Sequence, residues 1–342
     1  MDTVSSHFYA DFIHCLPRDS VNVLLGLHND RIRHEASRCL RLHPHRIIQI
    51  GRRDQKSSVW SFRLLERLPN SEDVRHLKMP DDLEHLKLDH IQLFPQIGYF
   101  PYYDLLTEEM KCGKWSPENQ FFICGGATDE GWIEAPEHGK RISEVLARCA
   151  ASGLHLQIGG MGFDEFYSRD QDLFIWPILD RISEFTANHC QGRPQDYNVK
   201  VVPPPFFTEL VEKLYQNRKM RKTSITFAVL TDISAVRRIV ENCENVVFDD
   251  IQHCEWWNPD QFHTANLDLL VDVAQKNPEK KWNYSQLMRA RSNSLEPWLE
   301  RNGFRKMNLK NRKHYFKRHM GSARFTVKRD QADVYLIKIW SA

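Results

Sequence analysis

The chain has 342 residues, a formal net charge of +2 and 41% hydrophobic residues. That apolar fraction excludes a globally disordered chain, and the balance of charges means that overall charge points to no particular partner. No stretch approaches the roughly 18 apolar residues of a membrane span, and no basic region followed by an apolar run opens the chain. We therefore expect a cytoplasmic or nuclear protein with no membrane partner.

Residues 1–45 predict a short helical module. Apolar residues between 8 and 16 recur at three-to-four spacing, which gives one apolar stripe on a helix. Pro17 ends that helix, and the apolar residues of 21–27 and 32–40 predict a second and a third. Three short helices form only a small core, so we expect the rest of the chain or a partner to cover this module.

Residues 46–300 predict a body of alternating strands and helices. Residues 47–50 and 59–62 favour two strands that pair as a hairpin, and Leu83 to Leu88 have the L-x-x-L-x-L spacing of leucine-rich repeats. Farther along, apolar strands are predicted at 121–124, 154–158, 199–202, 225–229 and 246–248. Each is followed by a helical pattern, over 142–149, 173–185, 207–214, 233–240 and 267–274 in turn, which predicts a parallel sheet in an α/β protein. We favour a leucine-rich-repeat-like β-α repeat body. A closed, doubly wound sheet predicts much the same pattern.

Residues 301–342 form a basic C-terminal segment. Residues 324–329 and 333–339 predict a β-hairpin. The stretch 301–329 is rich in Lys and Arg interleaved with aromatic residues, which is typical of surfaces that bind nucleic acid or another acidic partner. The candidate contact residues are Arg305, Lys310, Arg312, Lys313, Lys317 and Arg318.

Evidence for an enzyme is weak. Adjacent carboxylates at 129–130, 164–165 and 249–250 follow predicted strands, at the edge where α/β enzymes bind ligands. Such pairs usually face water or cap the following helix, and no nucleophile or phosphate-binding motif accompanies them. The eight cysteines form no Cys-x-x-Cys pair, and no histidine cluster has zinc-site spacing. We expect no catalytic residues, no metal and no cofactor. An α/β enzyme acting at the strand exits is the alternative.

The first residues carry a family resemblance. Met1 to Val4, Phe8 to Asp19, Val21 and Leu24 resemble the opening of F-box-like proteins, in particular the F-box-associated family expanded in nematodes, whose F-box is degenerate. Ser5 stands where that family has a proline, and residues 28–30 stand where it has a tryptophan.

The resemblance implies a role as substrate receptor of a Skp1–cullin ubiquitin ligase. The N-terminal module would dock on a Skp1-like adaptor, and the body would hold an unknown protein target. Carried over by position, the adaptor-facing residues are Val4, Phe8, Phe12, Leu16, Pro17, Val21 and Leu24. We therefore expect a non-enzymatic interaction protein. Binding of nucleic acid or an acidic partner through 301–329 is the alternative function.

Overall fold

The computed structural model describes a large part of the chain in two compact units. Unit 1 comprises residues 1–157 and 167–182, and unit 2 comprises 158–166 and 183–342. The described residues are 12–13, 16, 21, 23–42, 45–52, 59–67, 74–79, 83, 86–93, 131–135, 139–159, 175–188, 205–216, 220–226, 229–230, 233–249, 252–253, 259–289, 292–307, 315–331 and 334–341.

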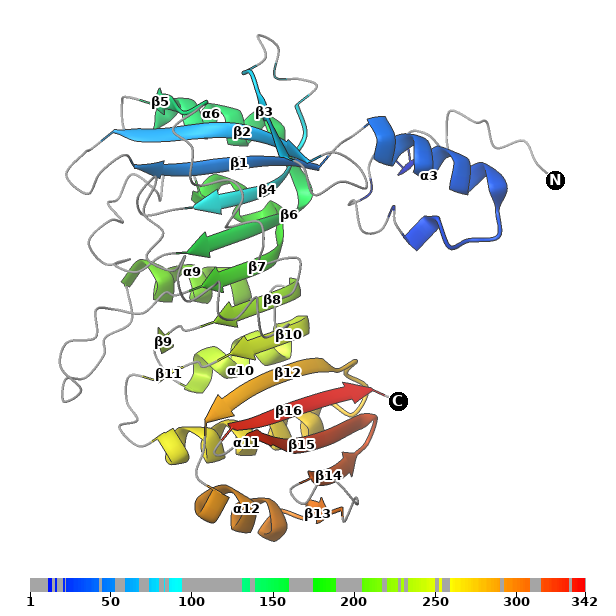
Figure 1. The fold of residues 1–342 in the computed structure, drawn as a ribbon, viewed down its shortest axis with the longest axis vertical. Helices are drawn as coiled ribbons and strands as arrows, with labels where there is room; N and C mark the ends of the chain where they lie inside the picture. Colours follow the sequence, from blue (N-terminus) through cyan, green and yellow to red (C-terminus); the bar gives the residue numbers. More distant parts are fainter. Residues whose placement is uncertain are drawn as a thin grey trace. The chain divides into compact units, whose positions relative to one another are not determined.

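Unit 1 begins with a helix, continues with five strands in succession, and ends with a helix, a strand and a 3-10 helix (Figure 1). Its elements are α3 (Asp30–Leu42), β1 (His45–Arg52), β2 (Trp60–Arg67), β3 (Val74–Leu77), β4 (Leu88–Leu93), β5 (Ile133–Ala135), α6 (Lys140–Cys149), β6 (Ala150–Gly159) and the 3-10 helix η1 (Trp176–Arg181). Its strands lie in the order β6-β4-β1-β2-β3, with β5 also on β2. Strand β1 is antiparallel to β2 and parallel to β4, so the predicted hairpin is confirmed.

Unit 2 has a longer series of strands. Its elements are β7 (Ile182–Asn188), α9 (Pro205–Tyr215), β8 (Met220–Thr226), β9 (Val229–Leu230), α10 (Ile233–Asn242), β10 (Cys243–Asp249), β11 (Gln252–His253), α11 (Pro259–Lys276), β12 (Asn283–Arg289), α12 (Ser292–Arg301), β13 (Arg305–Lys306), β14 (Tyr315–Met320), β15 (Ala323–Gln331) and β16 (Val334–Ser341). The main sheet runs in the order β13-β14-β15-β16-β12-β10-β8-β7.

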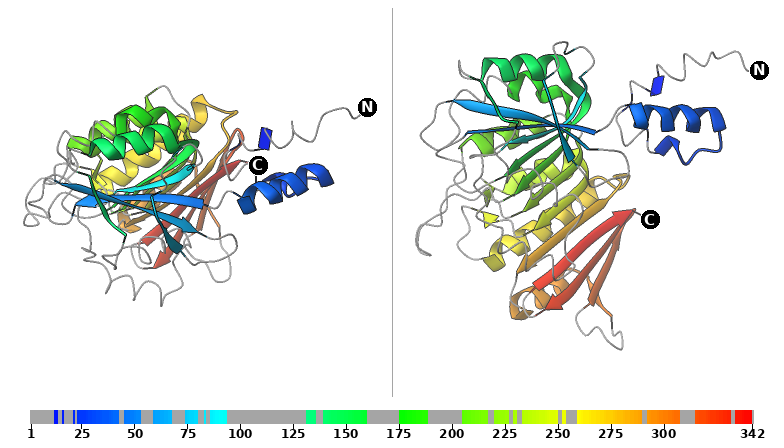
Figure 2. Two further views of the ribbon diagram at one scale, coloured as in Figure 1. Left: turned by 90° about the horizontal axis from the view of Figure 1, so that it is seen from above. Right: turned by 45° about the horizontal axis from the view of Figure 1, so that its top comes forward.

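The centre of the unit 2 sheet is parallel, and its C-terminal end is antiparallel. Strands β7, β8, β10 and β12 pair in parallel, whereas β16 pairs with β12, and β15, β14 and β13 follow in antiparallel register. Helices α9 to α12 lie on one face of these strands (Figures 1 and 2). Helix α10 buries Val236, Ile239 and Val240, the one-sided spacing that its sequence predicted. The expected mixed α/β fold and the C-terminal hairpin are confirmed.

Two sequence predictions differ from the structure. No leucine-rich repeat is identified in the described part of the chain, where the strands at both ends of the strand order pair antiparallel. The strand at the L-x-x-L-x-L motif of residues 83–88 begins at Leu88, the last residue of that motif. The helix expected over 173–185 is a short 3-10 helix that gives way to β7 at Ile182. There Phe185 and Ala187 are buried with the period of two that a strand requires.

No helix in the described residues has the length and apolar character needed to cross a membrane. The cysteines described are Cys39, Cys149 and Cys243, and all three are buried and form no disulfide bond with one another. Burial is the main cause that raises the thiol pKa of both Cys149 and Cys243, so these groups are protonated at neutral pH.

Candidate interaction surfaces

The N-terminal helical module has its own small core. Ile13 and Val21, from the first two helical segments, pack with Ala36 and Cys39 of α3. Leu16, Leu24 and Ile32 pack against this cluster and are only partly buried. On α3, positions 32, 36 and 39 follow the spacing that places side chains on one helix face. The module is therefore folded around these core residues.

Helix α3 begins at a well-defined cap. The side-chain Oδ1 of Asn29 accepts hydrogen bonds from the backbone N–H groups of Arg31 (3.1 Å) and Ile32 (3.2 Å). These are two of the four N–H groups that a helix start leaves without a backbone acceptor. Asp30 in the first turn is an ion-pair partner of Arg33. Asn29 and Asp30 thus stabilise the start of α3.

The same module exposes large apolar side chains. Six such side chains are exposed among the described residues, and four of them lie between positions 12 and 27. Phe12 is 50% exposed and Val23 70%, with Leu25 and Leu27 near 40%. Exposed apolar groups concentrated in one short segment, rather than scattered, mark surfaces that bind a partner. We call Phe12, Val23, Leu25 and Leu27 the apolar surface.

The structure divides the residues expected to face a Skp1-like adaptor. Phe12 lies on the apolar surface, whereas Val21 is buried in the module core. Leu16 and Leu24 lie partly buried at the edge of that core. Val4, Phe8 and Pro17 are outside the described residues.

Sequence reasoning missed the exposed residues at 23, 25 and 27. Their alternate spacing fits no single helix face, and the turn that contains them is held by backbone hydrogen bonds from Gly26 to Val23 and from Leu27 to Leu24. The available signal was the apolar run of 21–27, which is longer than one helical face can bury.

A row of polar side chains is buried across the strands of unit 1. Arg63 Nε donates to Gln49 Oε1 (2.6 Å), Gln49 Nε2 to Gln92 Oε1 (2.7 Å), and Gln92 Nε2 to Gln157 Oε1 (2.9 Å). Each residue is at most 1% exposed, and the row crosses β2, β1, β4 and β6. The Arg63 guanidinium also lies over the Trp132 ring, 4.7 Å from its centroid. Burial lowers the pKa of Arg63 to about 10, so it remains charged at neutral pH.

Beside this glutamine row lies a group of histidines. The rings of His90 and His155 stack with centroids 4.2 Å apart, and the His45 ring lies 5.8 Å from His90. Desolvation of His90, reinforced by its two histidine neighbours, holds its pKa well below 6.5. His90 is therefore neutral at physiological pH. Among the described residues, no three His, Cys, Asp or Glu side chains are grouped to hold a metal ion.

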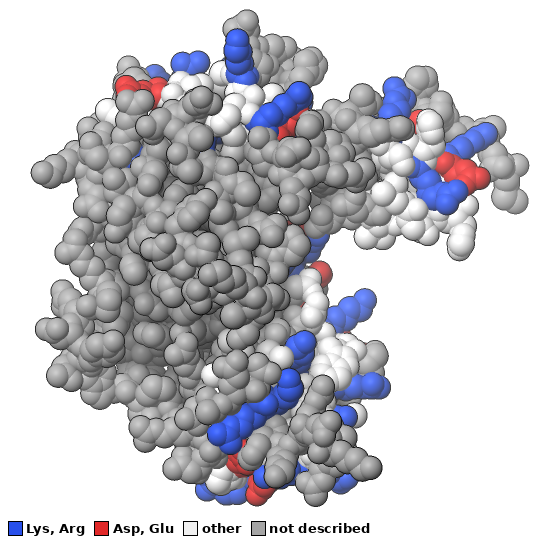
Figure 3. Space-filling view, in the orientation of Figure 1, with Lys and Arg blue, Asp and Glu red and all other residues white. Residues whose placement is uncertain are grey.

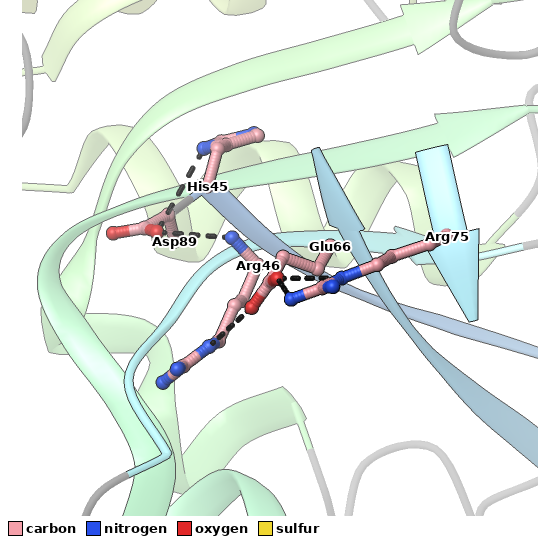
Figure 4. A network of polar contacts seen from close by, with 5 residues as sticks. All are labelled: His45, Arg46, Glu66, Arg75 and Asp89. Carbon is pink, nitrogen blue, oxygen red and sulfur yellow. Dashed lines mark hydrogen bonds and ion pairs between the residues drawn. The ribbon is translucent and has the colours of Figure 1, made fainter. Parts of the chain in front are cut away.

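An ion-pair network holds the edge of the unit 1 strands (Figure 4). Glu66 on β2 is 3% exposed, and it faces Arg46 on β1 and Arg75 on β3 in register. Arg75 Nε donates to Glu66 Oε1 (2.9 Å), and Arg46 Nε donates to Oε2 (3.4 Å). The backbone N–H of Arg46 donates to Asp89 on β4 (3.2 Å), which also lies 3.7 Å from His45 Nδ1. These contacts link strands β1 to β4. We therefore interpret them as interactions that fix the register of the strands rather than as a catalytic site.

Strand register separates the basic residues of the C-terminal segment. Arg305 and Lys317 are paired positions on β13 and β14, and the neighbouring pair joins Lys306 to the buried Phe316. Because successive side chains of a strand point to opposite faces, Arg305 and Lys317 project from the face opposite Phe316. Arg318 lies on the helix-covered face, with its guanidinium 5.7 Å from the Phe304 ring centroid. The remaining predicted residues, Lys310, Arg312 and Lys313, lie outside the described part of the chain.

The carboxylates considered for catalysis are mostly not described. The pairs at 129–130 and 164–165 lie outside the described residues, and Asp249 ends β10 without a described side chain. The enzyme alternative therefore stays an untested prediction. Comparison with protein-family models, with curated proteins and with solved structures gives no match, so the function is argued from the surfaces themselves.

Proposed function

We propose that this protein is a non-enzymatic adaptor, an F-box-like substrate receptor whose N-terminal module docks on a Skp1-like protein of a cullin ubiquitin ligase. The observation that carries the proposal is the apolar surface, because it concentrates exposed apolar side chains on a module with its own folded core. An amphipathic helical unit that leaves apolar groups in solvent is a typical docking element. The family resemblance of the first residues supplies the class of partner.

Within the module, the residues that form the core are different from the exposed apolar residues, and this supports the proposed role. Val21, Ala36 and Cys39 maintain the fold, whereas Val23 and Leu27 contribute little to that core. Side chains that are exposed in the free protein can be buried at an interface without unfolding the module. In this proposal the adaptor contact moves from the positions expected by sequence toward Phe12 and residues 23–27, while unit 2 remains available for the target.

The test is a titration of the full chain with a purified Skp1-like adaptor. We expect binding by the unaltered protein and a loss of at least about tenfold in affinity for Val23→Asp combined with Leu27→Asp, because two charges would be desolvated at the contact. The control is Val247→Asp, since Val247 is also an exposed apolar residue (39%) but lies on β10 of unit 2. Equal affinity for the double variant and the unaltered chain would refute the proposal.

A further inference from the structure

On the C-terminal strands, the face opposite the described helices carries several basic residues. The register places Arg305, Lys317, Thr326 and Lys338 in one row across β13, β14, β15 and β16. A second row brings Arg324 of β15 beside Trp340 of β16. In-register neighbours in a sheet project from the same side, and adjacent strands are about 5 Å apart. We call Arg305, Lys317, Arg324, Lys338 and Trp340 the basic face.

The opposite side of these strands is the core. Phe316, Phe325, Val327, Ile337 and Ile339 alternate with the residues of the basic face, and all are buried. Figure 3 views unit 2 from the side opposite helices α9 to α12, and described Lys and Arg side chains are visible there over the C-terminal strands. Strands β12, β13, β14 and β16 contain no Asp or Glu, and β15 contains one, Asp330.

The cations of the basic face differ from four other cations of unit 2. Lys213, Arg237, Lys276 and Lys306 each form an ion pair with a carboxylate. No ion pair with a described residue involves the four cations of the basic face. Several like charges within a few strand spacings, with no described carboxylate paired to them, favour an anionic partner.

Apolar side chains lie among these cations. Trp340 is 38% exposed, and Val247 is 39% exposed in the same row as Lys338, across Ser285. Leu336 is half-buried in the row of Lys328. A partner that satisfies this face needs apolar groups as well as negative charges.

The distribution of aromatic groups decides between two classes of polyanion. Single-stranded nucleic acid binds such faces by stacking bases on exposed rings. Here the second aromatic residue, Tyr315, is half-buried, and the amine of Lys317 lies 5.2 Å from its ring centroid. The exposed apolar area is therefore a single ring together with aliphatic side chains, which suits apolar side chains of a protein better than a series of bases.

We infer that the basic face binds an acidic protein segment in which Asp or Glu alternates with large apolar residues. This inference rests on the proposed function, because it assigns the target-holding surface of the receptor and the chemical class of the target. The carboxylates would pair with Lys317, Arg324 and Lys338, and the apolar side chains would pack on Trp340 and Val247.

The probe is a fluorescein-labelled synthetic peptide in which Glu and Asp alternate with Leu and Phe. Binding to the full chain is followed by fluorescence anisotropy, without any adaptor present. We expect saturable binding that weakens about tenfold in Lys317→Glu with Lys338→Glu, because attraction becomes repulsion at two positions. Lys317→Gln with Lys338→Gln should weaken it less, and Trp340→Ala should weaken it without altering its salt dependence.

Three controls make the result decisive. Lys276→Glu with Arg301→Glu changes the net charge equally, at exposed positions on α11 and α12, and should leave the affinity unchanged. A peptide with Ser in place of Leu and Phe should bind more weakly. Oligothymidine with the same number of charges should also bind more weakly than the acidic, apolar peptide.

Three outcomes would overturn the inference: equal loss in the α11 and α12 control, unchanged affinity in both Lys317 and Lys338 variants, or tighter binding of oligothymidine. Failure of the adaptor titration would leave this assay unaffected, because the peptide binds in the absence of adaptor. The two proposals can therefore fail separately.

Discussion

Two rows of polar side chains, one on the strands of each unit, differ in burial and in hydrogen bonding. In unit 1, the glutamine row from Arg63 to Gln157 is almost wholly buried, and its members are joined by side-chain hydrogen bonds. In unit 2, the row from Arg305 to Lys338 keeps its cations at the surface, with no described acidic partner. Buried polar groups must be satisfied inside the protein, whereas exposed ones are available to another molecule. The first row therefore specifies the fold, and the second is a candidate for binding.

The largest expected effect comes from breaking the buried row. Gln92→Leu removes the acceptor of Gln49 Nε2 and the donor to Gln157 Oε1, which leaves two buried amide groups without these partners. We expect a loss of about 2–4 kcal/mol in local stability. Hydrogen exchange measured by mass spectrometry should show faster exchange in β1, β4 and β6. Lys338→Leu, in the exposed row, should change the exchange of β16 by no more than about 0.5 kcal/mol, and equal losses would erase the contrast.

A smaller, pH-dependent effect is expected from His90. Its folded-state pKa is depressed by burial, so the folded protein holds it neutral while the unfolded chain protonates it near pH 6.5. Its contribution is thus complete above about pH 6.5 and is lost as the pH falls from there toward the folded-state pKa. The slope is about 1.4 kcal/mol per pH unit. Urea denaturation between pH 7.5 and 5 should show a shallower decline in His90→Leu, and an identical decline would contradict the assignment.

The smallest expected effect concerns the exposed row of cations in unit 2. Lys317 lies directly opposite Arg305, and like charges at opposite strand positions destabilise a sheet. We expect Lys317→Gln to leave the thermal midpoint unchanged or to raise stability by a few tenths, roughly 0.2–0.5 kcal/mol. A clear loss of stability, measured by calorimetry at low salt, would mean that Lys317 supports the fold and would weaken its interpretation as a binding residue.

Local sequence patterns predicted much of the secondary structure but not the pairing across it. The helix over 233–240, the strand near 246–248 and the C-terminal hairpin have strong local periodicity, and all are present. The strand β12 was missed because its apolar residues are interrupted by polar ones, of which Gln286 is buried against Asn266 of α11 (2.6 Å).

The candidate surfaces were predictable only in part. A basic segment is visible in the sequence, but only the strand register shows that Arg305 and Lys317 share a face with Lys338 and Trp340. The buried row did leave a signal, because Gln49, Gln92 and Gln157 each stand between two large aliphatic residues in a strand. One such glutamine is uninformative, and its meaning depends on partners 43 and 65 positions away along the chain.

The central claim is that the N-terminal module, and not the sheet of unit 2, contacts the adaptor. Hydrogen exchange of the full chain, measured with and without a Skp1-like adaptor, tests this most directly. We predict slower exchange in peptides that cover residues 12–42, with no change in peptides from β12 to β16. Protection of the β12 to β16 strands, with residues 12–42 unaffected, would contradict the account.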